Sequence, residues 1–390
     1  MKNFHMLILT ICLVMIGLMT GCHSSKIQLR ENTHYYNGEN LDLQRLTTIT
    51  NGHASQGTAI YKDTLFICNK HGHCYMYQFP NGEAITDFPL ASYDNSDTPH
   101  QNHCNQMMFG PQKFAKNDPF PLLYITTGYS GNHDSTGAYY AKCSIERILY
   151  SKEKGWYTEI VQTIAFNDEE NIPDKNIDGT LTEMYQNGRF WYTTGNGYYS
   201  SSKYQKIGYG WPHFYIDSAP TKDTVDKLYI FSSRFCGSDL GESIIQENYE
   251  FTDDSLNHYI LTEFDLPKLP KNTTSPSYGD TVTLYPKDIT NQFETEFDIY
   301  AFQGGTMYNG KIYHSFGYGN LNPREHNGIR VFDIAEQKIT AKLDLSSTEM
   351  ALWEPECCCI YNGELVLSAY NMNKTNKTVN LYILKGILEK

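Results

Sequence analysis

Three stretches of the sequence decide the fold, namely QGTAIYKDTLFI at residues 56–67, QGGTMYNGKIY at 303–313 and ECCCIYNGELVL at 356–367. Each reads as a short strand of small and apolar residues, a two-residue turn and a second apolar strand. The turn of the second and third copies is Asn-Gly, which is the strongest short signal for a β-hairpin. The copies therefore predict one hairpin that recurs along the chain.

Two weaker copies fill the gap between the first copy and the second. One starts with 104–109 and has a delayed second strand at 122–126, and the other covers 180–185 and 190–194. Further strand-like runs follow most of the hairpins, at 75–79, 84–88, 144–149, 159–166, 259–266, 281–285, 329–334, 339–345 and 379–384. The last unit then lacks a fourth strand, which residues 43–49 can supply from just before the first copy.

Four strands per unit, a period of roughly 50–70 residues and an N-terminal strand that completes the last unit describe a β-propeller. We predict an all-β fold, a single propeller of five blades over residues 43–390. An insertion in the third unit, around residues 195–256, could hide a sixth blade. A sandwich or another all-β meander is the alternative, because a two-strand repeat also occurs there.

Composition agrees with this class and excludes others. Of the 390 residues, 40% are hydrophobic and 19% are charged, which is typical neither of a disordered polyelectrolyte nor of a polytopic membrane protein. The 31 Tyr and 29 Gly favour strands and turns. Lys and Arg number 31 against 44 Asp and Glu, a net charge of −13 that argues against nucleic acid as a partner.

The N-terminus carries Lys2, an apolar run at 7–18 and then Met19-Thr20-Gly21-Cys22. Small residues directly before a cysteine resemble the lipobox of bacterial lipoproteins, in which the preceding segment is removed and the cysteine is acylated. Met19 stands where that family usually has Leu. An uncleaved anchor helix is the alternative, but a run of about 12 residues is short for crossing a bilayer.

This resemblance implies three segments, which are a signal peptide at 1–21, a polar tether at 22–42 and the propeller after it. It also implies a lipid on Cys22, the membrane as a partner, and a location in the bacterial cell envelope, periplasmic or surface-exposed.

The stretch 68–74 combines Cys68, His71, His73 and Cys74. Zinc accepts such side chains, but the usual Cys-x2-Cys spacing with a distant second pair is missing. A disulfide between the two cysteines across the hairpin and two free thiols are the alternatives. The other cysteines of the domain, including the triplet 357–359, fit small buried apolar residues. We expect no cofactor.

In a propeller, the first strand of each blade lines a central channel. Polar residues at the start of the repeated strands should therefore converge. The candidates for ligand binding are His53, Gln56, His100, His103, Asn105, Gln303, Glu354 and Glu356. Tyr209 and Trp211, in the aromatic run 209–215, add a second recognition surface, or else cover a small core of the insertion itself.

The repeat motifs, Pro355-Glu356 and the stretch Pro99-His100-Gln101-Asn102-His103 resemble the single-domain β-propeller lipoproteins of the Bacteroidetes kind. The resemblance spans residues 47–388. It implies the architecture and the envelope location, and no catalytic residue.

Three functions remain open. The first is recognition of an extracellular glycan or a partner protein in the envelope, since no catalytic motif accompanies the abundant Tyr, Asn and Gln. The second is a glycan hydrolase or lyase in which His103 works with Glu356 or Asp178 as base and acid. The third is an inert structural subunit, whose channel groups bond to one another or to water.

Overall fold

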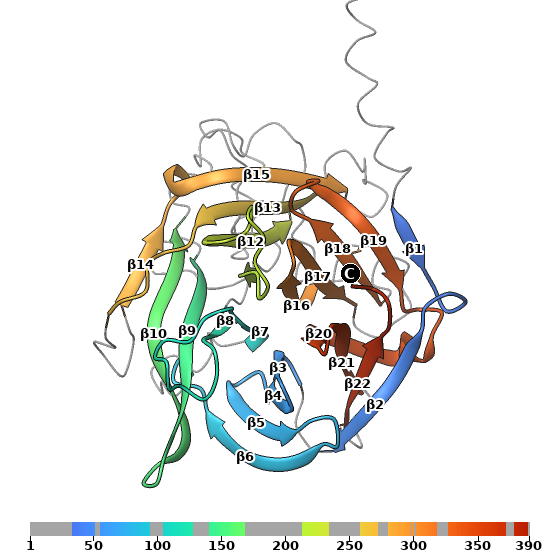
Figure 1. The fold of residues 1–390 in the computed structure, drawn as a ribbon. Coiled ribbons are helices and arrows are strands. Elements are labelled where there is room, and N and C mark those ends of the chain that lie inside the picture. The colour runs from blue at the N-terminus through green and yellow to red at the C-terminus, as the bar shows by residue number, and fades with distance from the viewer. Residues whose placement is uncertain are drawn as a thin grey trace, which may run out of the picture. The chain divides into compact units, whose positions relative to one another are not determined.

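The computed structural model describes residues 33–50, 55–93, 104–127, 140–167, 213–233, 258–271, 280–296, 298–299, 302–317, 327–371 and 378–388. Residues 35–390 form one compact unit. This unit is made of strands that form five sheets among the described residues, arranged radially about one axis (Figure 1). The prediction of an all-β propeller with five blades is confirmed.

The first and fifth blades follow the predicted pattern. The first consists, from the axis outward, of β3 (Thr58–Tyr61), β4 (Thr64–Cys68), β5 (His73–Gln78) and β6 (Glu83–Pro89). The fifth consists of β20 (Trp353–Tyr361), β21 (Glu364–Asn371), β22 (Thr378–Leu384) and β2 (Leu43–Thr50). The antiparallel pairing of β2 with β22 closes the ring with an N-terminal strand, as expected.

In the second and third blades, the structure differs from the predicted strand order. The second contains β7 (Cys104–Phe109), β8 (Leu123–Thr127), β9 (Tyr140–Ser151), β10 (Gly155–Asn167) and β14 (Asp280–Leu284). The third contains β11 (His213–Tyr215), β12 (Lys227–Ser233), β13 (His258–Asp265) and β15 (Ile289–Glu296).

The region at 195–256, predicted to be an insertion, thus supplies the two inner strands of the third blade instead of a sixth blade. The run at 281–285 does not end the third blade, because β14 pairs in parallel with β10 of the second. The predicted hairpin at 180–194 lies outside the described residues.

The fourth blade contains an outer strand that is not predicted from the sequence. It contains β16 (Phe302–Tyr308), β17 (Lys311–Phe316), β18 (Gly328–Asp333), β19 (Lys338–Asp344) and β1 (His34–Tyr36). The Tyr35 hydroxyl donates to Asp344 Oδ2 at 3.0 Å. Part of the predicted polar tether therefore belongs to a blade. Two short 3₁₀ turns, Pro286–Asp288 and Glu349–Leu352, precede β15 and β20.

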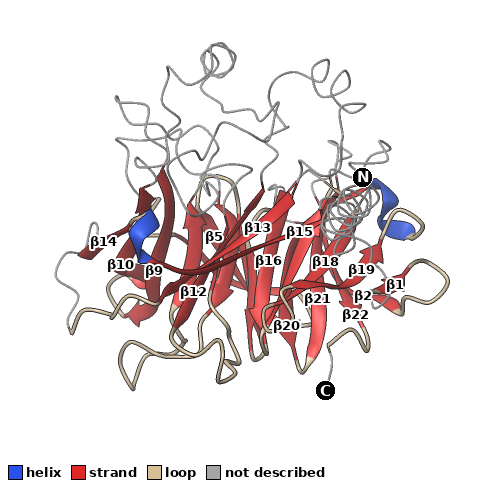
Figure 2. Cartoon of the chain, turned by 90° about the horizontal axis from the view of Figure 1, so that it is seen from above, coloured by secondary structure: helices blue, strands red, loops and turns tan. Residues whose placement is uncertain are grey.

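The hairpin turns explain why the three strong copies look alike. Lys62, Asn309 and Asn362 take φ values of 51°, 50° and 49° at the first turn position. Such positive φ values suit the right-handed twist of a tight hairpin, and Asn tolerates them well. We call the end where the inner strands β3, β7, β16 and β20 begin the upper end, and the end where they finish the lower end, as in Figure 2.

The core lies between blades rather than in one centre. Strand β18 is buried along its whole length, whereas the outer strand β6 is mostly exposed. The cysteine triplet shows the pattern, since Cys358 packs among residues of the fourth and fifth blades and Cys359 among residues of the fifth and first. All seven described cysteines are buried free thiols, as the apolar interpretation expected.

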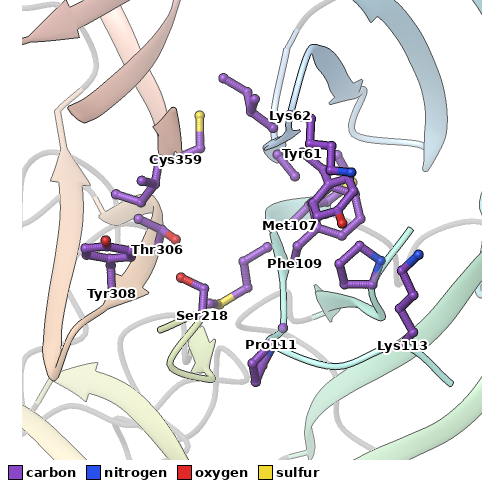
Figure 3. Close-up of a pocket in the computed structure, with 16 residues that line it drawn as sticks. Tyr61, Lys62, Met107, Phe109, Pro111, Lys113, Ser218, Thr306, Tyr308 and Cys359 are labelled. Carbon is purple, nitrogen blue, oxygen red and sulfur yellow. The ribbon is translucent and has the colours of Figure 1, made fainter. Parts of the chain in front are cut away.

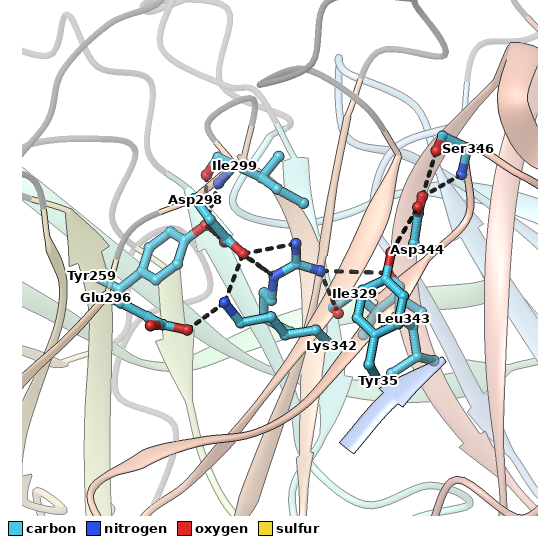
Figure 4. A network of polar contacts seen from close by, with 11 residues as sticks. Tyr35, Tyr259, Glu296, Asp298, Ile299, Ile329, Lys342, Leu343, Asp344 and Ser346 are labelled. Atoms are coloured by element: carbon cyan, nitrogen blue, oxygen red, sulfur yellow. Dashed lines mark hydrogen bonds and ion pairs between the residues drawn. The ribbon is translucent and has the colours of Figure 1, made fainter. Parts of the chain in front are cut away.

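A partly buried ion network joins the third and fourth blades (Figure 4). Arg330 of β18 contacts Asp298 with its Nε at 3.0 Å and 3.1 Å and with its terminal nitrogen at 3.0 Å. Lys342 of β19 adds a contact to Asp298 at 3.0 Å and another to Glu296. The Tyr259 hydroxyl of β13 donates to the backbone oxygen of Ile299 at 2.6 Å. Charge thus holds together two blades whose strands do not pair.

Candidate functional site

The upper end of the inner strands carries a set of polar side chains. Three inner strands contain a β-bulge there, since the register with the second strand shifts between 104 and 106 in β7, between 302 and 305 in β16 and between 355 and 357 in β20. A bulge re-aims the residue that it leaves unpaired and often borders a site. The backbone positions left out of the pairing are Asn105 in β7, Gln303 and Gly304 in β16, and Glu356 in β20. The repeat therefore conserves a backbone irregularity along with a hairpin.

Hydrogen bonds connect these residues across blades. The Gln303 amide nitrogen donates to Glu354 Oε1 at 3.0 Å and to the carbonyl of Gly317 at 3.0 Å. The Gln56 amide nitrogen, just before β3, lies 3.5 Å from Glu356 Oε1. The first, fourth and fifth blades meet here. We define Gln56, Gln303, Glu354 and Glu356 as the upper polar cluster.

The two carboxyls of the cluster are held towards their neutral forms. Burial raises the pKa of Glu356 well above its ordinary value of 4.5, and the charge of Glu354 raises it further. Burial also raises the pKa of Glu354, against the opposing effect of the Gln303 amide. A neutral carboxyl both donates and accepts hydrogen bonds, as an amide does. The cluster is therefore a largely buried set of amide and carboxyl groups in which the charged form of each carboxyl is disfavoured.

Tyr370 belongs to the same place and was missed in the sequence. It lies opposite Glu354 in the pairing of β20 with β21. Burial, followed by the charges of Glu356 and Glu354, raises the pKa of its half-buried phenol. Tyr370 lies in β21, nine residues after Tyr361, the residue that precedes the turn of the last repeat. The composition of this strand gives no sign of a site. The pairing register alone reveals its position.

Below the cluster, the channel residues bond to one another. Thr58 Oγ donates to Ser368 Oγ at 2.8 Å, which links the first blade to the fifth. Gln106 donates to the Gly305 carbonyl at 3.1 Å and accepts from Thr126 Oγ at 3.0 Å. This layer fits the structural role that the sequence left open for the channel, because its polar groups are satisfied within the protein.

Close backbone approach keeps this layer narrow. The Gly57 amide donates to the Cys104 carbonyl at 2.7 Å, directly between the first and second blades. A Cβ on Gly305 would come within 2.4 Å of the Tyr313 carbonyl oxygen. Glycine is required at both places because a side chain would collide with a neighbouring strand.

The aromatic run at 209–215 does not form the predicted surface where it is described. His213, Phe214 and Tyr215 are the buried strand β11. The Tyr215 hydroxyl shares a short hydrogen bond with His314 Nδ1, and the His213 ring lies 4.8 Å from the His314 ring. Burial, and then His213, lowers the pKa of His314 well below 6.5. These groups are a neutral part of the core between the third and fourth blades.

Several predicted residues lie outside the described part of the chain. They are Cys22, His53, His100, His103, Asp178, Tyr209 and Trp211. Asn105 is placed by its backbone alone.

The four possible zinc ligands of the stretch 68–74 do not come together as a metal site. Cys68 and Cys74 are buried and face each other across β4 and β5, whereas His71 is exposed. His73 Nε2 lies 2.6 Å from Asp87 Oδ2 on β6. No group of three or more potential metal ligands occurs among the described residues. The strand alternation turns the cysteines and His73 to opposite faces.

Comparison with known proteins adds the following. No family model matches the chain, and no curated protein matches it. Among solved structures, Myxococcus xanthus glutaminyl cyclase matches with 9% identity and a TM-score of 0.37, covering 90% of this chain and 99% of that one. Chaetomium thermophilum Raptor matches with 7% identity and a TM-score of 0.34, over 88% of this chain and 29% of that one. Neither similarity bears on function.

Proposed function

We propose that this protein is an exported lipoprotein whose propeller binds a neutral, hydroxyl-rich ligand, an extracellular glycan, at the upper polar cluster. The observation that carries the proposal is the contact of two glutamine amides with two carboxyls from different blades, at a place where burial raises the pKa of both carboxyls. Sugar hydroxyls both donate and accept, and so match uncharged amide and carboxyl groups. Tyr370 supplies an aromatic ring with a polar tip beside them.

Glycan binding should depend on the amide and carboxyl of the cluster. We expect Gln303→Leu and Glu354→Leu each to weaken binding about tenfold, because a lost hydrogen bond leaves its partner unsatisfied. Glu354→Gln should retain affinity, since an amide replaces a neutral carboxyl. A glycan array identifies the ligand, and calorimetry on the hits measures the affinities.

Gln78→Leu is the matched control, because Gln78 lies on β5 and its amide donates to the Asp63 carbonyl at 3.0 Å away from the cluster. Glycan binding that is unchanged in both Gln303→Leu and Glu354→Leu contradicts the proposal, and so does the absence of binding to any glycan. Unchanged binding would direct the search to a partner protein.

A catalytic role is a second candidate, favoured by the raised pKa of Glu356. A carboxyl that stays protonated near neutral pH can act as a general acid. Product formation from a bound glycan, lost on joint replacement of His103 and Glu356, would establish a hydrolase or lyase. Saturable binding without products supports recognition alone.

Lipid attachment at Cys22 is tested separately. We expect the wild-type protein, expressed in a bacterium with an alkyne-labelled fatty acid, to carry the label and to sediment with membranes. Cys22→Ala should lose both properties, because acylation needs the thiol. Cys236→Ala serves as control and should keep the label. Within the described residues, no helix has the length and apolarity that crossing a membrane requires.

A further inference from the structure

A cavity lies at the lower end of the inner strands, away from the upper polar cluster (Figure 3). Its volume is about 340 Å³, within the range of small-molecule sites. Strands β3, β7, β16 and β20 contribute walls, and Ser218 reaches it from the segment after β11. All five blades therefore meet at this cavity, as they do at a binding site on a propeller axis.

The walls are largely apolar and aromatic. Met107, Phe109 and Pro121 are buried, and Tyr61 packs against Phe109 with ring centroids 5.6 Å apart. The thiol of Cys359 also borders the cavity, and burial raises its pKa well above 9. It stays protonated at neutral pH, so it is a packing group and not a nucleophile. Such walls suit the apolar body of a ligand.

The charge at the cavity is positive. Among the described lining residues, Lys62 and Lys113 are charged and no residue is acidic. Lys62 Nζ lies 5.4 Å from the centre of the Tyr61 ring, and Lys113 Nζ donates to the Asp118 carbonyl at 2.7 Å. Both ammonium groups are exposed, and each has three donors, so donors remain for a ligand. In a chain of net charge −13, the lining of this cavity therefore carries a local excess of positive charge.

We propose that the lower cavity binds a small organic carboxylate with an aromatic or other apolar body. The body would lie between the walls formed by Tyr61, Phe109 and Met107. The carboxylate would lie at the mouth, within reach of Lys62 and Lys113. This site is independent of the glycan proposal, because no residue of the upper polar cluster lines the cavity.

The test uses three probes of nearly equal shape, which are 3-phenylpropionate, 3-phenylpropionamide and 3-phenylpropylamine. Calorimetry on the full chain should show saturable binding of one carboxylate per chain. The amide should bind at least about tenfold more weakly and the amine more weakly still, because charge-assisted hydrogen bonds are stronger than neutral ones. Equal affinity for carboxylate and amide, or no saturable binding of the carboxylate at millimolar concentration, overturns the proposal.

A variant locates the site. Lys62→Asn combined with Lys113→Gln removes both charges, and asparagine tolerates the φ of 51° at position 62. The carboxylate should lose at least about tenfold in affinity while the amide is unaffected. Lys154→Asn is the matched control, since Lys154 Nζ also lies over a tyrosine ring, 4.9 Å from the centre of Tyr157, at an outer hairpin. Unchanged carboxylate affinity in the double variant would also overturn the proposal, and the comparison of wild-type probes stands should that variant misfold.

Discussion

Replacing Arg330 with methionine is expected to lower the free energy of unfolding by about 2–3 kcal/mol, because it leaves the partly buried Asp298 carboxylate without its main partner. Only 3% of Arg330 is exposed, and its guanidinium makes three contacts with Asp298. The charges of Arg330 and Lys342 hold the pKa of the Asp298 carboxyl below its usual range, against the effect of burial. Urea unfolding of wild type and variant at neutral pH measures the loss.

A second substitution separates charge from packing. Asp298→Asn together with Arg330→Met removes the stranded charge, so the double variant should be more stable than Arg330→Met alone. Lys338→Met breaks a partly exposed pair with Glu336 and should change stability by less than about 1 kcal/mol. A loss below about 1 kcal/mol for Arg330→Met, or a double variant less stable than the single one, would show that the network does not join the blades as described.

Glu356→Gln is expected to be more stable than wild type at neutral pH, by an amount that shrinks as the pH falls towards 4.5. The carboxyl is 1% exposed, and burial and then Glu354 raise its pKa well above 4.5. In the unfolded chain it ionises above 4.5, whereas the folded protein keeps it protonated. Over that window the folded state binds more protons, and stability falls by up to about 1.4 kcal/mol for each rise of one pH unit until the folded pKa is reached. Glutamine is neutral throughout and does not lose this stability.

Thermal and urea unfolding of both proteins from about pH 5 to about pH 8 measures the difference. Glu153→Gln is the control, because Glu153 is exposed at the β9–β10 turn. Parallel stability curves for wild type and Glu356→Gln would show that Glu356 is ionised in the folded protein. The upper polar cluster would then be a charged site, and a neutral glycan would no longer be its best match.

The expected destabilisation by Glu356 at neutral pH bears on the function of the upper polar cluster. A carboxyl that destabilises the protein at neutral pH is not explained by packing, since glutamine of nearly the same shape would serve better. Buried ionisable residues that lower stability are typical of binding or catalytic sites. The same reasoning does not extend to the layer around Thr58 and Gln106, whose hydrogen bonds are satisfied within the protein.

The sequence by itself determined the inner hairpins of the first, second, fourth and fifth blades, and the number of blades. Alternation of small and apolar residues and the turns at Lys62, Asn309 and Asn362 are local, so they can be seen without coordinates. The equivalence of Gln56, Gln303 and Glu356 followed from the same repeat, and the structure places all three at the upper end. Closure by 43–49 followed because the last unit was one strand short.

Only the tertiary structure decided which distant segments meet. β14 pairs with β10 and not with the third blade, and β11 is a buried three-residue strand that no local pattern marks. The position of Tyr370, the raised pKa values of the two carboxyls and the lower cavity likewise depend on burial and on neighbours from other blades. Local turns and alternation are encoded within a few residues, whereas burial, register and charge environment arise when remote parts of the chain pack together.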